Sequence, residues 1–237
     1  MKTFLFDLDG TLLPMDQEFF IKKYFNELAK VSNLLGYDAK KLLNSVWEGI
    51  KSMVSNDGTT TNRERFWDTF VNIYGEHIRD SEQHFISFYE NEFHKVKDAT
   101  NPTPLAGECV RILKEKKYRL ILATNPIFPE IATLARINWA GLNPEDFDVI
   151  TTYENSSYCK PNLEYYKEIL EKCNSNIKDC IMIGNDVSED MCVSKLGMDT
   201  FLLNENIINE KNEDISKYRQ GSMKEFYTFV TELPYLD

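Results

Sequence analysis

Polar side chains that could carry out catalysis follow four apolar runs of the sequence. The candidates, in chain order, are Asp7 and Asp9; Thr124 and Asn125; Lys160; and Asn185, Asp186 and Asp190. In an open parallel sheet, ligands bind at the edge where the strands have their carboxyl ends. If the apolar runs form parallel strands of one sheet, we expect these side chains to meet in one crevice.

Three acidic residues among these candidates favour a bound cation. Asp7, Asp9 and Asp186 would converge, and two unit charges about 4 Å apart repel by roughly 4 kcal/mol at an effective dielectric constant near 20. Carboxylate oxygens without a nearby His or Cys are ligands typical of Mg²⁺. The His residues all lie in a separate helical stretch: His77, His84 and His94. We therefore expect Mg²⁺, and we exclude a zinc site or a His base within the sheet domain.

A phosphate group suits the combination of Mg²⁺ with Lys160. Phosphoryl transfer depends on positioning and on neutralising charge, and a carboxylate can act as nucleophile and form an aspartyl-phosphate. A second carboxylate two residues further on can protonate the leaving alcohol and then deprotonate the water that hydrolyses the intermediate. Asp7 and Asp9 have this spacing, and their two roles require two different environments.

Short apolar runs alternate with helical patterns over most of the chain. Strands are expected at residues 3–6, 119–123, 147–151, 180–183 and 200–203, the last of the sheet, and helices at 105–116, 129–137, 161–173, 188–196 and 223–233. This alternation is typical of a parallel sheet with right-handed crossovers. The sequence therefore predicts an α/β fold.

One long helical stretch interrupts the alternation directly after the first strand. Apolar residues recur at helical spacing from about residue 16 to residue 98, in four groups, with Asn62 as a candidate N-cap of the third helix. We predict a core domain of residues 1–15 and 100–237 and a helical-bundle cap domain of residues 16–99. The crossings near residues 13–16 and 99–104 would be the hinges.

The composition limits the possible partners. The chain has 237 residues, 42% of them hydrophobic, enough for a core domain with a smaller inserted one. The formal net charge of −11 disfavours nucleic acid and anionic membranes as partners. Five Cys without a Cys-x-x-Cys spacing, and no apolar stretch of about 18 residues, predict free thiols in a cytoplasmic protein. Nothing in the sequence indicates the oligomeric state.

These residue groups resemble the four motifs of the haloacid dehalogenase superfamily. The resemblance depends on Asp-Leu-Asp-Gly-Thr at 7–11, Thr124 after a strand, Lys160-Pro161, and Gly-Asn-Asp at 184–186 with Asp190 downstream. It extends over nearly the whole chain. It implies a three-layer, Rossmann-like parallel sheet, with the helical stretch as a C1-type cap between the first and second motifs.

The resemblance also implies a role for each matching residue. Asp7 would be the nucleophile and Asp9 the general acid and base, while Thr124 and Lys160 would bind the phosphoryl group. Mg²⁺ would be held by the Asp7 carboxylate, the Asp9 backbone carbonyl and an acid of the fourth motif. Asn125 could bind the phosphoryl group or form the turn before Pro126.

The fourth motif departs from the usual pattern of the superfamily. Many members have an Asp directly after the motif's glycine, where this chain has Asn185. We assign Asp186 to the metal and treat Asn185 and Asp190 as supporting groups.

The expected reaction is hydrolysis of a small phosphorylated metabolite. Dehalogenases and phosphonatases of the superfamily lack an acid two residues after the nucleophile, so Asp9 argues against both. A phosphomutase keeps both acids and remains an alternative. A non-catalytic metabolite-binding or scaffold protein is an alternative of another class, against which the intact motifs argue.

Several residues of the helical stretch and one Cys allow two interpretations. Arg63 and Arg65 could meet an anionic leaving group or be solvated helix charges. Trp47 and Trp67 could belong to the core or line the substrate cavity. Cys159, beside Lys160, is expected to be inert packing.

Overall fold

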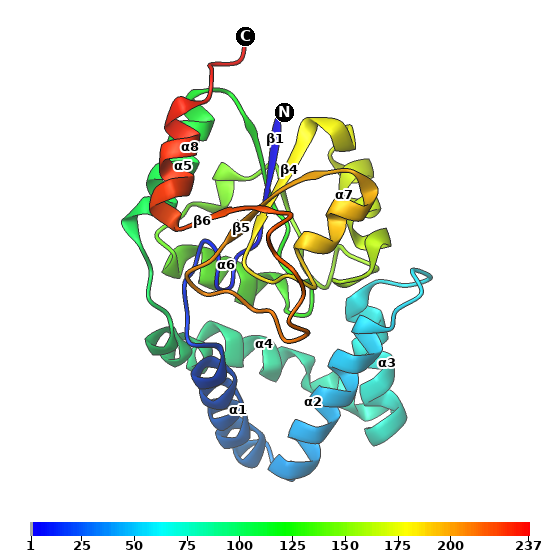
Figure 1. Cartoon of the computed structure of the whole chain (residues 1–237). Coiled ribbons are helices and arrows are strands. Elements are labelled where there is room, and N and C mark those ends of the chain that lie inside the picture. Colours follow the sequence, from blue (N-terminus) through cyan, green and yellow to red (C-terminus); the bar gives the residue numbers. More distant parts are fainter. Residues whose placement is uncertain (1) are drawn as a thin grey trace.

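The computed structural model describes residues 2–237 and contains a six-stranded parallel sheet (Figure 1). Its strands are β1 (Thr3–Phe6), β2 (Arg119–Leu122), β3 (Val149–Ile150), β4 (Cys180–Gly184), β5 (Asp199–Leu203) and β6 (Arg219–Gly221). The order in the sheet is β3-β2-β1-β4-β5-β6. The direction of chain order reverses between β1 and β4, and open sheets of this kind bind ligands at that point.

Helices cover both faces of the sheet, which confirms the predicted α/β fold. They are α5 (Pro104–Glu115), α6 (Glu130–Trp139), α7 (Leu163–Lys172) and α8 (Met223–Glu232). Phe4 and Phe6 of β1 face an apolar core shared with α5, α6 and α8, whereas Leu5 faces a second core shared with α7. Burial on both faces explains why the two central strands, β1 and β4, consist almost entirely of apolar residues.

A continuous helical segment lies beside the carboxyl edge of the sheet (lower part of Figure 1). Its elements are α1 (Gln17–Leu34), α2 (Ala39–Val54), α3 (Asn62–Tyr74), the 3-10 helix η1 (Glu76–Ser81), α4 (Glu82–Glu90) and the 3-10 helix η2 (Glu92–Ala99). Asp16, Asp38 and Thr61 cap the first three helices, each accepting a backbone N–H of its own helix. The helices thus begin where short polar residues precede apolar stripes.

The chain enters and leaves this helical segment at adjacent points. Met15 and Thr100 form an antiparallel bridge. The N–H of Asp16 donates to the carbonyl of Ala99 at 3.0 Å, and the N–H of Asn101 donates to that of Pro14 at 2.7 Å. The two crossing strands are therefore bonded into one short ribbon.

A second connection lies at the start of α3. The side-chain amide of Asn62, fully buried, donates to the carbonyls of Pro126 at 3.2 Å and Tyr158 at 3.3 Å. The backbone N–H of Asn62 donates to the carbonyl of Ser156 at 2.8 Å. Asn62 therefore bonds to both the loop after β2 and the loop after β3.

The prediction that Asn62 caps α3 was wrong by one residue. Thr61 is the N-cap, and its side chain and that of Glu64 form a reciprocal capping box. Thr61 is half-buried at the end of the helix and supplies the cap, which leaves the amide of Asn62 free to bond across to the sheet loops.

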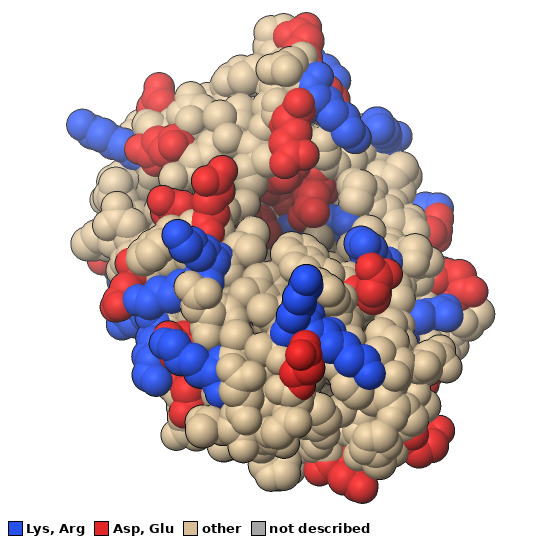
Figure 2. All heavy atoms as spheres, turned by 90° about the horizontal axis from the view of Figure 1, so that it is seen from below, with Lys and Arg blue, Asp and Glu red and all other residues tan. Residues whose placement is uncertain are grey.

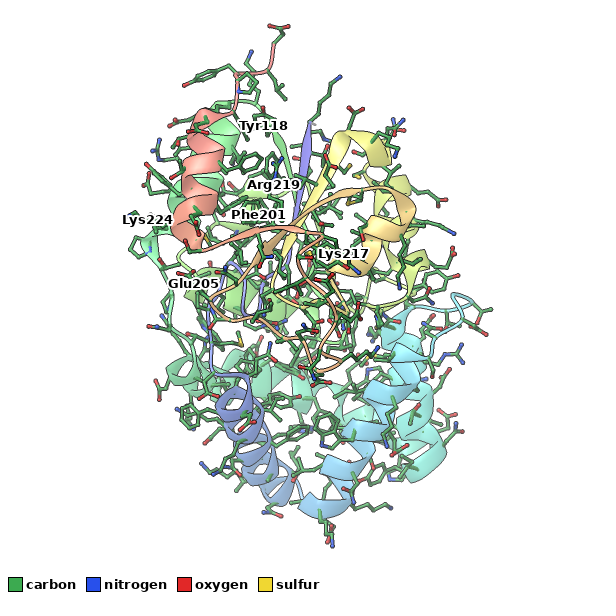
Figure 3. All side chains as sticks on the ribbon, in the orientation of Figure 1. Tyr118, Phe201, Glu205, Lys217, Arg219 and Lys224 are labelled. Carbon is green, nitrogen blue, oxygen red and sulfur yellow. The ribbon has the colours of Figure 1, made fainter. Side chains whose placement is uncertain are left out.

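The strand predicted at residues 200–203 is present as β5 (Asp199–Leu203), but it is not the last strand of the sheet, because β6 follows it. Arg219 of β6 pairs in register with Phe201 of β5 (Figure 3). β6 is an edge strand of three residues whose first two side chains are exposed. Such a strand has no apolar run, so the pattern used to find the others does not detect it.

The helix expected at residues 188–196 is instead a 3-10 helix, η5 (Met191–Leu196), after a bonded turn. The Asp186 side chain accepts the backbone N–H groups of Ser188 and Glu189 at 2.7 and 2.9 Å. A side chain that binds nearby N–H groups in this way favours a turn over a helix.

The surface is acidic, as the net charge of −11 requires. Figure 2 shows Asp and Glu side chains around a hollow in the face seen from below. Within residues 2–237, no helix is both long and apolar enough to cross a membrane. All five Cys are buried and free, as predicted from their number and spacing.

Candidate active site

The loop after β1 is bonded tightly to the loop after β4. Gly10 has a φ of +86°, and a Cβ there would lie 2.5 Å from the amide nitrogen of Asn185. The hydroxyl of Thr11 donates to Asn185 Oδ1 at 2.8 Å. A glycine is therefore required at this point, and Asn185 connects the two loops.

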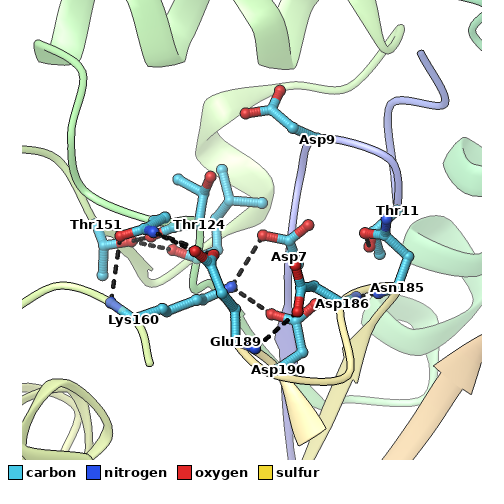
Figure 4. A network of polar contacts seen from close by, with 12 residues as sticks. Asp7, Asp9, Thr11, Thr124, Thr151, Lys160, Asn185, Asp186, Glu189 and Asp190 are labelled. Carbon is cyan, nitrogen blue, oxygen red and sulfur yellow. Dashed lines mark hydrogen bonds and ion pairs between the residues drawn. The ribbon is translucent and has the colours of Figure 1, made fainter. Parts of the chain in front are cut away.

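Lys160 lies at the centre of the site, joined to two carboxylates (Figure 4). Its side chain is fully buried, and its Nζ lies 2.9 Å from Asp7 Oδ1 and 2.6 Å from Asp190 Oδ1. Burial alone would lower the pKa of Lys160, but the charges of Asp190 and Asp7 outweigh it and hold that pKa well above its usual value. Lys160 is therefore a permanent buried cation.

Asp190 holds the loop after β4 in place. Its Oδ2 accepts the backbone N–H groups of Asn185 at 3.1 Å and Asp186 at 3.0 Å. A Cβ on Gly184 would lie 2.1 Å from that same oxygen, so only glycine allows Asp190 to approach. These contacts fit the supporting role expected of Asp190 and Asn185.

Asp186 presents a carboxylate on the same side of the sheet as Asp7 (Figure 4). Both backbone N–H groups that it accepts, from Ser188 and Glu189, bind Oδ1. Burial raises the pKa of Asp186, and those two hydrogen bonds partly oppose the shift. The carboxylate is thus oriented by one oxygen only.

The side chain of Asp9 turns away from Asp7 and pairs with Arg136 of α6. Arg136 is buried, while the Asp9 side chain is 25% exposed and its Oδ1 has no hydrogen-bond partner among residues 2–237. Burial raises the pKa of Asp9, with Arg136 opposing the shift. The sequence analysis did not find Arg136, because one Arg within an apolar helix carries no motif.

The expected convergence of three carboxylates is therefore not what the structure shows. Within residues 2–237, no group of three His, Cys, Asp or Glu side chains lies close enough together to hold a metal. Asp7 and Asp186 lie together at the carboxyl edge of the sheet, whereas the Asp9 side chain pairs separately with Arg136.

The loop after β2 brings Thr124 and Asn125 to the same edge. The Thr124 carbonyl accepts the hydroxyls of Thr151 and Tyr165, both at 2.7 Å. The Asn125 side chain accepts the Lys160 N–H at 3.2 Å and donates to both carboxylate oxygens of Glu189 at 3.0 Å. Asn125, in the loop after β2, is therefore hydrogen-bonded to the loop after β3 and to the loop after β4.

Glu189 is the second residue that the sequence analysis missed. Burial raises its pKa to about 8, with Lys160 opposing the shift. The sequence could have indicated Glu189 by its position between Asp186 and Asp190, because this position puts a further acid in the loop after β4.

The structure shows the surroundings of the arginine, tryptophan and cysteine residues for which the sequence allowed two interpretations. Arg63 pairs with Glu82, and Arg65 pairs with Asp57 at 2.7 Å, so both are helix charges with acidic partners. Trp67 belongs to the buried core and also lines one apolar pocket, whereas Trp47 is 42% exposed and lines another. Cys159 is buried, and burial raises the pKa of its thiol, as expected of inert packing.

The family of the chain follows from a match to a family model. Residues 1–191 match the model of haloacid dehalogenase-like hydrolases. The chain belongs to this family, and it is a hydrolase.

Three relatives show how far the likeness extends. Two glyceraldehyde 3-phosphate phosphatases are similar: one from Methanothermobacter thermautotrophicus is 23% identical, covering 92% of each chain, and one from Methanocaldococcus jannaschii is 25% identical, covering 98% of each. A crystal structure of a phosphatase of this superfamily from Thermococcus onnurineus covers 100% of both chains with a TM-score of 0.62 and 18% identity. This last likeness concerns the fold.

Proposed function

We propose that this hydrolase is a Mg²⁺-dependent phosphatase that cleaves small-molecule phosphate monoesters through an aspartyl-phosphate at Asp7. The observation that carries the proposal is the Asp7 carboxylate at the end of β1, with Lys160 Nζ at 2.9 Å. Two relatives with phosphatase names, each aligned over more than nine-tenths of its length, support it. Residues 16–99 would form the cap domain, and residues 1–15 and 100–237 the core.

The donors at the carboxyl edge fit Mg²⁺. The proposed ligands are the carboxylates of Asp7 and Asp186 and the backbone carbonyl of Asp9, an all-oxygen set. Mg²⁺ in proteins usually uses one or two carboxylates and keeps several waters or phosphate oxygens, so a cluster of three acidic side chains is not required. Bound there, Mg²⁺ would neutralise the charge that develops on the phosphoryl oxygens.

In the first step, the Asp7 carboxylate attacks the phosphorus atom, and the bond from phosphorus to the alcohol oxygen breaks. Asp9 would leave Arg136, turn toward that oxygen and donate its proton to it, a role that its raised pKa favours. Lys160, with Thr124 and Asn125 beside it, would bind the phosphoryl oxygens. In the second step, water attacks phosphorus, gives its proton to Asp9, and releases phosphate and the free Asp7 carboxylate.

Asp7→Asn tests the nucleophile. Phosphate release from p-nitrophenyl phosphate with Mg²⁺ is expected to fall by at least about 1,000-fold, because the amide cannot attack. Acid-quenched wild type should carry one added phosphoryl mass on the peptide that contains Asp7. The matched control is Asp199→Asn, which removes an exposed carboxylate at the start of β5 and should keep full activity. Substantial turnover by the Asp7 variant would rule out the mechanism.

The five free buried thiols also fit a reducing compartment, so we propose the cytoplasm as the location.

A further inference from the structure

A pocket beside Asp9 is lined almost entirely by apolar side chains. Its walls come from α1, α2 and the loop after β2, and its volume is about 210 Å³. Phe25, Trp47, Ile50 and Phe128 are among the lining residues. Asp9 is the one carboxylate in the lining, so the pocket begins at the proposed general acid.

The aromatic walls of this pocket are flat. The rings of Phe25 and Trp47 stack, with centroids 5.0 Å apart and planes 29° apart. The Phe128 ring meets that of Tyr24 edge-on at 5.6 Å. Trp47 remains 42% exposed, and Ile21 at the rim remains 43% exposed. A flat apolar group could lie against the open faces of such rings and cover surface that the protein leaves exposed.

The pocket offers few polar partners and no Lys or Arg in its lining. The Tyr24 hydroxyl already lies 2.9 Å from that of Tyr89. Arg136 is buried behind Phe128, with its guanidinium carbon 4.4 Å from the ring centroid, and is paired with Asp9. Gln17 also belongs to the lining and has a polar side chain that could bond to a ligand. A polyol or a second anionic group would therefore replace few of its bonds to water.

We propose that this pocket binds the leaving group, and that the substrate is a phosphate monoester of an uncharged alcohol carrying a flat apolar group, such as an aryl ring. The inference rests on the proposed function, because Asp9 is there the donor to the leaving oxygen. The carbon skeleton attached to that oxygen starts at Asp9 and extends along the pocket wall that includes Phe25, Trp47 and Phe128. Glyceraldehyde 3-phosphate, named for two relatives, has no apolar group that would fill this space.

Turnover of two matched esters tests the substrate class. With the full chain and Mg²⁺, kcat/KM for 2-phenylethyl phosphate is expected to exceed that for glycerol 3-phosphate by about tenfold or more, because one ester buries an apolar ring and the other does not. Equal turnover of both, or a preference for the glycerol ester, would overturn the inference and leave the phosphatase proposal intact.

Binding of non-hydrolysable analogues separates this inference from the proposed function. By calorimetry, 3-phenylpropylphosphonate should bind about tenfold tighter than propylphosphonate, whether or not the protein hydrolyses esters. Tight binding of the phenyl analogue without turnover of any ester would support the pocket and refute the phosphatase. Equal binding, together with a dimer that Ile21→Lys dissociates, would assign this apolar face to a second copy of the chain instead.

A variant and its control locate the effect. Trp47→Ala should reduce the binding ratio of the two phosphonates about fivefold, since it removes one wall of the pocket. Phe19→Ala, on α1, removes an exposed aromatic ring outside the lining and should leave that ratio unchanged. A ratio unaffected by Trp47→Ala would contradict the pocket assignment.

Discussion

The two sides of the cavity at Asp9 are built on different principles. On the sheet side, Lys160, Asn185 and Asp190 are fully buried, and each is hydrogen-bonded to at least one other loop. On the helical side, Phe25, Trp47 and Ile50 make apolar contacts that depend on shape alone. A change on the sheet side should therefore affect every substrate alike, whereas a change on the helical side should affect substrates according to their leaving group.

Metal removal should have the largest effect and should be independent of substrate. Chelation with EDTA is expected to abolish phosphate release from both 2-phenylethyl phosphate and glycerol 3-phosphate, with rescue by Mg²⁺, because the ligands all lie on the sheet side. Mg²⁺ should also raise the melting temperature of the wild type, and raise that of Asp186→Asn less. Undiminished turnover in chelator would remove the metal from the mechanism.

Lys160→Met should have the second-largest effect on activity. Activity is expected to fall at least about 100-fold for both esters, since the phosphoryl group loses its buried cation. The metal-free protein should also lose about 3 kcal/mol of unfolding free energy, because Asp7 and Asp190 are left without their shared partner. Lys167→Met, on the exposed side of α7, is the control for losing a lysine. A loss of activity confined to one ester would mean that Lys160 acts on the leaving group and not on the phosphoryl group.

Arg136 lies between the sheet side and the helical side of the cavity. Its replacement should shift the pH dependence of kcat/KM. Its charge lowers the pKa of Asp9 against the effect of burial. Arg136→Met removes that charge, so the pKa of Asp9 rises further. Asp9 then keeps its proton to higher pH, and the alkaline limb of kcat/KM against pH should move upward. Arg136→Lys, which keeps the charge, should move it less; an alkaline limb that stays in place would show that Asp9 is not the acid.

Asn62→Ala should have the smallest effect of the four. The buried amide bonds to carbonyls in two sheet loops, so its loss is expected to lower the free energy of unfolding by about 1–2 kcal/mol. Urea denaturation measures this, with exposed Asn72→Ala on the same helix as the control. Equal stability of the two variants would mean that Asn62 contributes nothing across the contact.

The sequence predicted that Asp7, Lys160 and Asn185 meet at one edge of the sheet, but it predicted neither the separate pairing of Asp9 nor the helical side of the cavity. Asp7 and Asn185 directly follow buried apolar strands, and Lys160 lies in the loop after a third strand, so their meeting follows from parallel strands. Arg136 and Phe128 have no comparable signal, because each reaches Asp9 or the pocket through tertiary packing of a helix and a loop. The sequence pattern also fails to predict β6, because its exposed residues are held by pairing with β5 and not by burial of an apolar run.

The two attachments of the helical segment have different mechanical consequences. At Met15 and Thr100 the chain is bonded to itself as a ribbon, so those bonds survive if the whole segment tilts. At Asn62 the bonds run between the segment and two loops of the sheet, so a tilt must break them. We therefore expect the first attachment to act as a hinge. Any opening that releases a bound alcohol should then rotate the helical segment about residues 13–16 and 99–104 and break the hydrogen bonds of Asn62 first.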